Sequence, residues 1–211
     1  MGVKERKARE FKRREEGIIA ATYQLLTQME PVQVTMEMIA EKTEIGRGTI
    51  YKHFKSKDEI FATLILRRRA KINTRLKTIE QKRDNIIHQF VREYMDYCLE
   101  DPDAFAVHKK CVNHYSKANL GEELLGALKN QKEELVLLVE KTLKPVVGAP
   151  RESSPPERYF IYAGWGMLRG AMESMMTDLF NSKPLHEEEY CKAVEKILLS
   201  GIPTLFKLEK A

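Results

Sequence analysis

Apolar residues recur at helical spacing along almost the whole chain, and the first clear case begins at Ile18. Thr22 is the one polar residue on the apolar face of this predicted helix, and Pro31 ends it. The apolar residues of that face are Ile18, Ala21, Leu25, Leu26 and Met29. The spacing therefore predicts an amphipathic helix that packs one face on a core.

Two shorter helices are predicted behind it. Thr35 is a good N-cap for a helix that carries Glu37 in its first turn and ends near Thr43. A third helix is expected from about residue 46 to 54, and Ser56 then caps a fourth. Short helices with a tight turn between the last two describe a helix-turn-helix.

Beyond residue 70 nearly everything is predicted as long helix. The expected ranges are 86–99, 103–116, 121 to just before Pro145, 157–180 and about 187–206, with a loop at 148–157. The helix at 157–180 is apolar on almost all sides, so we expect it to be buried on almost all sides.

The predicted fold class is all-α with about nine helices, because no strand pattern is found. We expect a basic N-terminal arm at 1–16, a three-helix helix-turn-helix DNA-binding domain at 17–62, and a larger helical ligand-binding and dimerisation domain at 63–211.

The positive charge is concentrated in the N-terminal third of the 211-residue chain. Residues 1–75 hold 17 basic and 10 acidic side chains, whereas the remainder holds 19 basic and 21 acidic ones. This asymmetry favours a polyanionic partner at one end. Residues 3–16 are expected to be a frayed helix or a disordered arm. Their role is either that of a solvated tail or that of a direct contact with phosphates.

Several classes of protein are disfavoured. No apolar run is long enough for a membrane span and no apolar signal segment is found, so we expect a cytoplasmic protein without a membrane partner. His108, Cys111 and His114 recur every three residues, but on a helix they converge poorly, so no metal and no cofactor are expected. No nucleophile–base pair or phosphate loop supports an enzyme, so no catalytic residue is proposed.

The second helix of a helix-turn-helix lies in the DNA major groove, with its N-terminal half at the base edges. With Ile50 and Phe54 toward the core, the outer side of the helix carries Gly48, Thr49, Tyr51 and Lys52, with Arg47 and His53 at the margins. A charged surface helix with a simple core contact is the alternative.

The expected roles follow from side-chain chemistry. Arg47 can donate two hydrogen bonds to guanine, Lys52 can reach a base or a phosphate, and Gly48 and Thr49 let the backbone approach closely. The residues expected at phosphates are Tyr51, His53, Lys57 and Thr35.

Residues 35–65, TMEMIAEKTEIGRGTIYKHFKSKDEIFATLI, resemble the DNA-binding signature of the tetracycline-repressor (TetR) family, and the resemblance covers roughly residues 18–65. The matching positions are Thr35, Ile39-Ala40, Ile45, Gly48-Thr49-Ile50-Tyr51, His53-Phe54 and Lys57-Asp58-Glu59. The chain departs from the family at Glu44, where a turn glycine is common, and at Gly46, where a serine is usual.

The resemblance implies a ligand-responsive transcriptional repressor. Members of the family are homodimers whose two heads dock in successive major grooves of double-stranded DNA, and a small molecule in the C-terminal domain shifts the spacing of the heads. We expect a near-palindromic operator for such a dimer.

Glycines in the helix at 157–180 favour close helix packing. Gly164, Gly166 and Gly170 each cost helix propensity, about 1 kcal/mol relative to alanine, that packing must offset. With the last helix, this one resembles the family's four-helix dimer interface. Packing within one chain is the alternative.

A ligand pocket is expected in the C-terminal region, lined by aromatic and methionine side chains that suit an apolar or amphiphilic molecule. Arg169 either pairs with Glu173 or faces an anionic ligand. The candidate lining residues are Phe90, Tyr94, Tyr97, Phe105, Tyr115, Trp165, Met167, Arg169, Met172, Met175 and Met176. A plain core, in a DNA-binding protein that senses no ligand, is the alternative.

Overall fold

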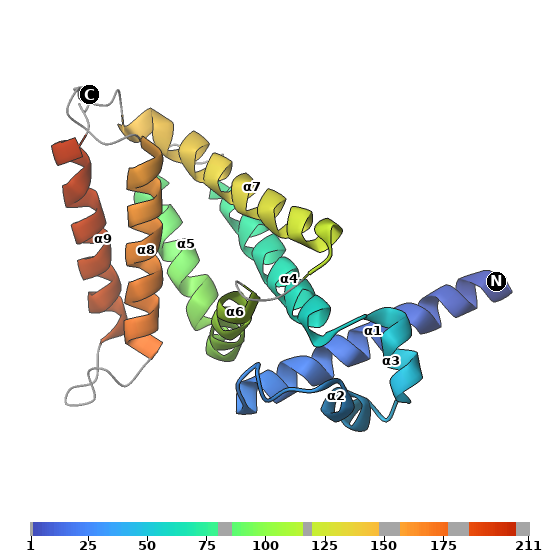
Figure 1. Ribbon diagram of the computed structural model, residues 1–211. Coiled ribbons are helices and arrows are strands. Elements are labelled where there is room, and N and C mark those ends of the chain that lie inside the picture. The colour runs from blue at the N-terminus through green and yellow to red at the C-terminus, as the bar shows by residue number, and fades with distance from the viewer. Residues whose placement is uncertain (1, 80–85, 116–119, 148–156, 177–185, 206–211) are drawn as a thin grey trace. The chain divides into compact units, whose positions relative to one another are not determined.

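All the regular secondary structure of the chain is α-helical over residues 2–79, 86–115, 120–147, 157–176 and 186–205, which the computed structural model describes (Figure 1). These ranges contain nine helices and no strand, as the apolar spacing predicted. Their bounds are α1 Val3–Gln28, α2 Met36–Thr43, α3 Arg47–His53, α4 Lys57–Lys77, α5 Ile86–Leu99, α6 Pro102–Tyr115, α7 Glu122–Val147, α8 Glu157–Met176 and α9 Glu187–Leu205. None of these described helices is both long and apolar enough to cross a membrane.

The chain divides into two compact units. The first comprises Met1–Ala70 and Asp103–Gln131, so it contains α1 to α3, most of α4, nearly all of α6 and the start of α7. The second comprises Lys71–Pro102 and Lys132–Ala211 and contains α5, α8 and α9. The division expected from the sequence, with boundaries after residues 16 and 62, stays a prediction.

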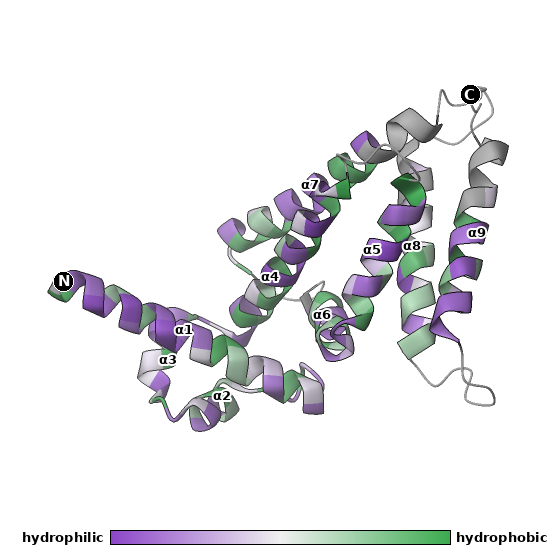
Figure 2. Cartoon of the chain, turned by 180° about the vertical axis from the view of Figure 1, so that it is seen from behind, coloured by the Kyte–Doolittle hydropathy of each residue, from purple (hydrophilic) through white to green (hydrophobic). Residues whose placement is uncertain are grey.

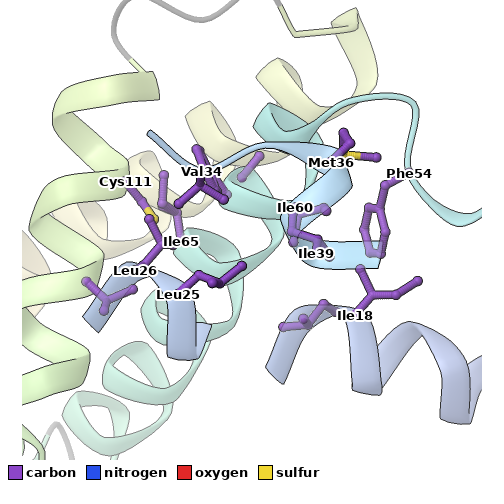
Figure 3. Close-up of a cluster of buried hydrophobic side chains, with 14 of the residues drawn as sticks. Ile18, Leu25, Leu26, Val34, Met36, Ile39, Phe54, Ile60, Ile65 and Cys111 are labelled. Atoms are coloured by element: carbon purple, nitrogen blue, oxygen red, sulfur yellow. The ribbon is translucent and has the colours of Figure 1, made fainter. Parts of the chain in front are cut away.

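One cluster of buried side chains stabilises the first unit (Figure 3). Its fully buried isoleucines and leucine come from each of the first four helices: Ile18, Leu26, Ile39, Ile50, Ile60 and Ile65. Cys111 of α6 and Leu128 of α7 complete the cluster. Removing such a side chain from water contributes about 1.5–3 kcal/mol. Helices as short as α2 and α3 are marginal in isolation, so this burial is what keeps them folded.

The predicted apolar face of α1 is confirmed, and its one polar member is satisfied. Thr22 is completely buried, and its hydroxyl donates a hydrogen bond to the carbonyl oxygen of Ile18, 2.8 Å away. A buried hydroxyl without a partner would be costly, so this bond explains how a threonine can face the core.

Three residues set the start of α2 and the turn between α2 and α3. Thr35 caps α2, as predicted, because its hydroxyl oxygen accepts a hydrogen bond from the Met38 amide at 3.2 Å. Glu44 ends α2 in the left-handed conformation, with φ 54° and ψ 29°. Gly46 then caps α3 without a side-chain hydrogen bond. Glu44 therefore stands where the backbone favours glycine, which explains why a glycine is usual at that turn position.

Lys57 ties the start of α4 to the connector between α1 and α2. Its ammonium donates hydrogen bonds to the carbonyl oxygens of Pro31, Val32 and Val34, at 2.9, 3.3 and 2.8 Å. These carbonyls belong to no helix, so the lysine supplies the donors that regular structure would otherwise provide. The sequence pointed to a phosphate contact for Lys57 and did not indicate this role.

Polar contacts also connect α6 to α1 and α4 within the first unit. Lys110 donates to the carbonyls of Leu26 and Met29 at the end of α1, at 3.1 and 3.2 Å. His114 Nε2 lies 2.7 Å from an Asp58 carboxylate oxygen in the first turn of α4. The last carbonyls of a helix lack partners within it, so Lys110 acts as a C-terminal cap for α1.

In the second unit, α5 packs on both α8 and α9. The ring of Tyr94 on α5 lies against that of Trp165 on α8, with centroids 4.6 Å apart. Arg75, near the end of α4, pairs with Glu93 on α5 and with Glu100 just after it. These contacts place aromatic side chains of the predicted ligand region at a helix–helix contact.

The structure decides or corrects three helix predictions. First, α1 begins at Val3, so of the two alternatives for residues 3–16, a frayed helix or a disordered arm, the helix is the one observed. Second, α7 continues through Pro145 to Val147. A proline has a helix-compatible φ, so it can stand within a helix at the cost of one backbone hydrogen bond and a close approach to the carbonyl four residues before it. The predicted loop at 148–157 and the last four residues of the helix predicted to end at 180 lie outside the described residues, apart from Glu157, which begins α8.

Third, α8 is not buried on all sides within its own chain. Tyr159, Tyr162 and Met167 are each about half exposed, and Gly166 and Gly170 are exposed on the same face. The buried positions are those that face α5 and α9, such as Leu168 and Met172. The apolar character that predicted complete burial thus includes a face whose side chains are about half exposed.

Replacement of Glu44 by glycine should stabilise the protein. A non-glycine residue in the left-handed region costs about 1–2 kcal/mol, and glycine's greater freedom in the unfolded chain offsets roughly half of that. We expect Glu44→Gly to raise the free energy of unfolding by about 0.5–1 kcal/mol in urea denaturation. Glu41→Gly, inside α2, should instead lower it by a similar amount, and an equal loss from both variants would contradict the account.

Removal of the Lys57 ammonium should destabilise the first unit. Lys57→Met keeps the length of the side chain but leaves three carbonyls without their donor, and hydrogen bonds of charged groups contribute about 1.5–3 kcal/mol. We expect a loss of that size in denaturant unfolding. Lys55→Met, two residues earlier at an exposed position, should change stability by less than about 0.5 kcal/mol. Equal and small effects would show that the ammonium does not stabilise the connector.

Candidate nucleic-acid interface

α3 is a helix of seven residues with one buried face. Ile50 is completely inaccessible to solvent, and Phe54, the C-cap, is nearly so. Both belong to the core cluster of the first unit, in which Figure 3 labels Phe54 close to Ile18 and Ile39. Two turns of helix are thereby fixed on the surface of the unit by their own apolar side chains.

The opposite face of α3 carries the residues that the sequence indicated. Arg47, Gly48 and Lys52 are exposed, and Tyr51 is 49% exposed, whereas Thr49 is half-buried. The structure therefore brings this predicted set together on one short helix. This face presents a hydroxyl, a phenol and two cationic groups. All of them can donate hydrogen bonds, and base edges and phosphate oxygens can accept them.

The glycines around α3 have no packing reason to be glycine. A Cβ atom built on Gly46 or on Gly48 would have no other atom within 4 Å. Neither has a positive φ, so backbone strain does not demand glycine either. The small size of Gly48 is thus free to serve a contact outside the chain.

Arg47 pairs with Glu37, which lies in the first turn of α2. Both side chains are at least half exposed, and exposed pairs contribute at most about 1 kcal/mol. Arg47 can therefore exchange this carboxylate for another acceptor at little cost. Glu37 was expected only to stabilise the start of α2, and its proximity to Arg47 across the turn was not predicted.

His53 ends α3 and is covered by a residue that the sequence analysis missed. The ring of Phe11, in α1, stacks on the imidazole with centroids 3.9 Å apart and an interplanar angle of 29°. Burial lowers the pKa of His53, and the nearby Arg14 adds to this while Glu15 opposes it. The imidazole is therefore mainly neutral at neutral pH. Phe11 lies seven residues before Ile18 on the same helical face, which is the signal that could have revealed the contact.

The two remaining predicted DNA contacts are partly engaged within the chain. Thr35 uses its hydroxyl oxygen as the cap of α2, which leaves its hydroxyl proton available. The Lys57 ammonium donates to three carbonyls of the connector, so its predicted phosphate contact would compete with these bonds.

The predicted ligand-lining residues fall into both units. Phe90, Tyr94, Tyr97 and Met172 are buried in the second unit, where Trp165, Arg169, Met175 and Met176 are half-buried and Met167 is exposed. Phe105 is buried in the first unit, and the side chain of Tyr115 lies outside the described residues. An open depression on α9 is lined by other residues, namely Lys192, Glu195, Lys196 and Ser200.

The histidines and cysteine considered for a metal have other surroundings. His114 contacts Asp58, and burial raises the pKa of the Cys111 thiol to about 12. Within the part of the chain that the structure describes, no group of three potential ligands is close enough together to hold a metal ion.

The comparison with known protein families identifies the N-terminal segment. Residues 18–64 match the family of bacterial regulatory proteins called the tetR family. This range contains the helix-turn-helix and the start of α4. No curated protein matches the chain in sequence.

Solved structures share the fold over nearly the whole chain. PfmR, a TetR family transcriptional regulator from Thermus thermophilus, has a TM-score of 0.60 at 16% identity, covering 87% of this chain and 97% of that one. The fatty acid degradation regulator FadR from Bacillus halodurans has a TM-score of 0.67 at 16% identity, covering 90% and 96%. SmeT in complex with triclosan has a TM-score of 0.62 at 16% identity, covering 89% and 90%.

At such identities the structural likeness shows the fold alone, whereas the match at residues 18–64 concerns the sequence of the helix-turn-helix itself. The two findings agree with the geometry of α3: residues 18–64 form a helix-turn-helix of the tetR family of bacterial regulatory proteins, in a chain that shares the fold of solved TetR-family regulators.

Proposed function

We propose that the protein is a repressor that binds a near-palindromic DNA site as a homodimer and is released from it by a small apolar or amphiphilic molecule. The observation that carries the DNA-binding part is the exposed face of α3. It places Arg47 and Gly48 above the buried Ile50, with open space where a side chain on Gly48 would be.

On DNA, α3 enters the major groove with its N-terminal half at the bases. Arg47 leaves Glu37 and donates two hydrogen bonds to a guanine, while Lys52 reaches a base or a phosphate. Thr49 offers its hydroxyl and methyl groups to a base edge. Tyr51 and His53 donate to phosphate oxygens, and these contacts fix the position of the helix without reading sequence.

The open face of α8 supports the dimer. Tyr159, Tyr162, Gly166, Met167 and Gly170 recur at i, i+3, i+7, i+8 and i+11, so they form one apolar face with small residues at its centre. Ile197 of α9 is also more than half exposed. Burial of such a face against a second copy removes apolar area from water and allows close helix approach.

The aromatic contacts of the second unit support a ligand of apolar character. The rings of Tyr94 and Trp165 lie against each other at a tilt of 57° between α5 and α8, and the guanidinium of Arg75 lies 5.3 Å from the centre of the Tyr97 ring. Two proteins of the same fold are described as a fatty acid degradation regulator and as a complex with triclosan. An inducer must bind the DNA-free form more tightly than the DNA-bound form, so ligand and DNA oppose each other reciprocally.

Arg47→Ala should weaken binding to the preferred duplex by about 1–3 kcal/mol and relax the base preference at one position in each half-site. Selection from a random duplex library, followed by fluorescence anisotropy on the enriched sequence, measures both quantities. Lys192→Ala removes one exposed charge from α9 and should leave both unchanged. Equal affinity and equal preference in the Arg47 variant and the unmodified protein would exclude α3 as the reading helix.

Gly166→Glu should convert the dimer to monomer. A Cβ atom at Gly166 would have no other part of the chain within 4 Å, so the start of the new side chain fits, but the substitution puts a charge at the centre of the apolar face. Sedimentation velocity at micromolar concentration should show the dimer for the unmodified protein and for Gly126→Glu, a glycine on α7 that also has open space at its Cβ position. A monomer in the unmodified protein would refute the proposed assembly.

A thermal-shift screen of fatty acyl compounds, aromatic acids, phenols such as triclosan and cationic dyes should find a molecule that both stabilises the protein and releases DNA. Stabilisation follows because a ligand that binds only the folded state raises its stability. If the hit is anionic, Arg169→Ala should reduce its affinity more than it reduces stability. A screen in which no binder releases DNA would argue for a regulator that senses no ligand.

A further inference from the structure

The first four turns of α1 form a helix that has no core beneath it. Residues 3–16 hold seven basic and four acidic side chains, and almost all of them are exposed. Figure 2 shows this part of α1 as predominantly hydrophilic. A helix that is polar all round gains little from packing, so its order depends on local contacts and on the buried half of α1 that continues it.

The four carboxylates of this segment do not cancel its seven cations, and 7 − 4 leaves a net charge of +3. Glu5 accepts a hydrogen bond from the Gly2 amide at 3.1 Å, Glu10 pairs with Arg14 of the same segment, and Glu16 pairs with Arg67 of α4. The exposed cations therefore dominate the electrostatic potential around the segment, and such a surface attracts a polyanion.

The segment is attached to the end of α3 by the stacking of Phe11 on His53. Phe11 is the one aromatic side chain among residues 3–16, and about half of it remains exposed. This contact fixes where the segment lies relative to α3, because both helices belong to the first unit. The basic surface is thus continuous with the face that we propose enters the major groove.

The lysines on the face of Phe11 are the ones placed toward α3. At 100° per residue, Lys7 and Lys4 lie within about 40° of Phe11, one and two turns before it, whereas Arg6 and Arg13 lie on the opposite face. At 1.5 Å per residue, residues 3–10 extend about 12 Å beyond Phe11. The major groove is itself about 12 Å wide, so this length reaches the strand that borders it.

We propose that Lys4 and Lys7 bind the sugar–phosphate backbone beside the major groove that α3 enters, so that the extension of α1 is a second DNA contact. The inference rests on the proposed role of α3. Charge complementarity with phosphate supports it, as does the continuity with α3 through Phe11. A contact to phosphates adds affinity and salt dependence but no sequence preference.

The test compares two double variants of the full-length protein. Lys4→Gln with Lys7→Gln removes two charges from the face of Phe11, and Arg6→Gln with Arg13→Gln removes two charges from the opposite face of the same helix. Binding is measured between about 0.1 and 0.4 M salt. The probes are the duplex that the unmodified protein enriches from a random library and an unrelated duplex of equal length. All four positions are exposed, so folding is not at risk.

Each phosphate contact contributes about 0.9 to the slope of log affinity against log salt. In the proposed dimer each copy loses two contacts, so the lysine variant should lose about 3.6 in slope, and about 10- to 30-fold in affinity per half-site at 0.15 M salt, by the same factor for both duplexes. The arginine variant should change much less. Equal effects of the two variants, no effect of the lysine variant, or a change in sequence preference would each overturn the inference. If the unmodified protein bound neither duplex, the proposed DNA-binding role of α3 would fail instead.

Discussion

The burial of Ile50 and Phe54 is the interaction on which the proposed DNA-facing surface depends. A helix of seven residues has too few internal hydrogen bonds to persist alone, so α3 exists because these two side chains enter the core of the first unit. The opposite face of α3 is not needed for packing against the core. The exposed side chains of Arg47, Tyr51 and Lys52 can therefore serve to bind a partner without being required for the stability of the fold.

Charged side chains supply hydrogen-bond donors to backbone carbonyls that have no partner within a helix. Lys57 satisfies three carbonyls of the connector between α1 and α2, and Lys110 satisfies two at the end of α1. These cations share the first unit with the exposed ones but have a different function. The net charge of the N-terminal third therefore overstates how much positive charge is available to a polyanion. The available positive charge lies on the exposed surfaces of α3 and α1.

Periodicity predicted the helices well because each buries one face, and this holds for Ile18 to Leu26 in α1 as for Ile50 and Phe54 in α3. The cap at Thr35 was also evident from local chemistry, whereas the unusual turn residue Glu44 was evident only from the resemblance to the family. Contacts between residues far apart in sequence were not predicted. The stacking of Phe11 on His53 and the carbonyl contacts of Lys57 depend on the tertiary arrangement, which the spacing of residues along the chain does not reveal. For the same reason the exposed face of α8 could not be separated from its buried face.

The central claim is that Gly48 is small so that the backbone of α3 can approach DNA. Gly48→Gln, with Gly126→Gln on α7 as the matched control, tests it through paired measurements of unfolding free energy and DNA affinity. Both glycines are helical with open space at the Cβ position, so both variants should gain up to about 1 kcal/mol of stability from helix propensity. The account predicts that only Gly48→Gln then loses DNA affinity. The expected loss is tenfold or more, which corresponds to a binding free energy of about 1.4 kcal/mol or more. Undiminished DNA affinity in a folded Gly48→Gln protein would contradict it.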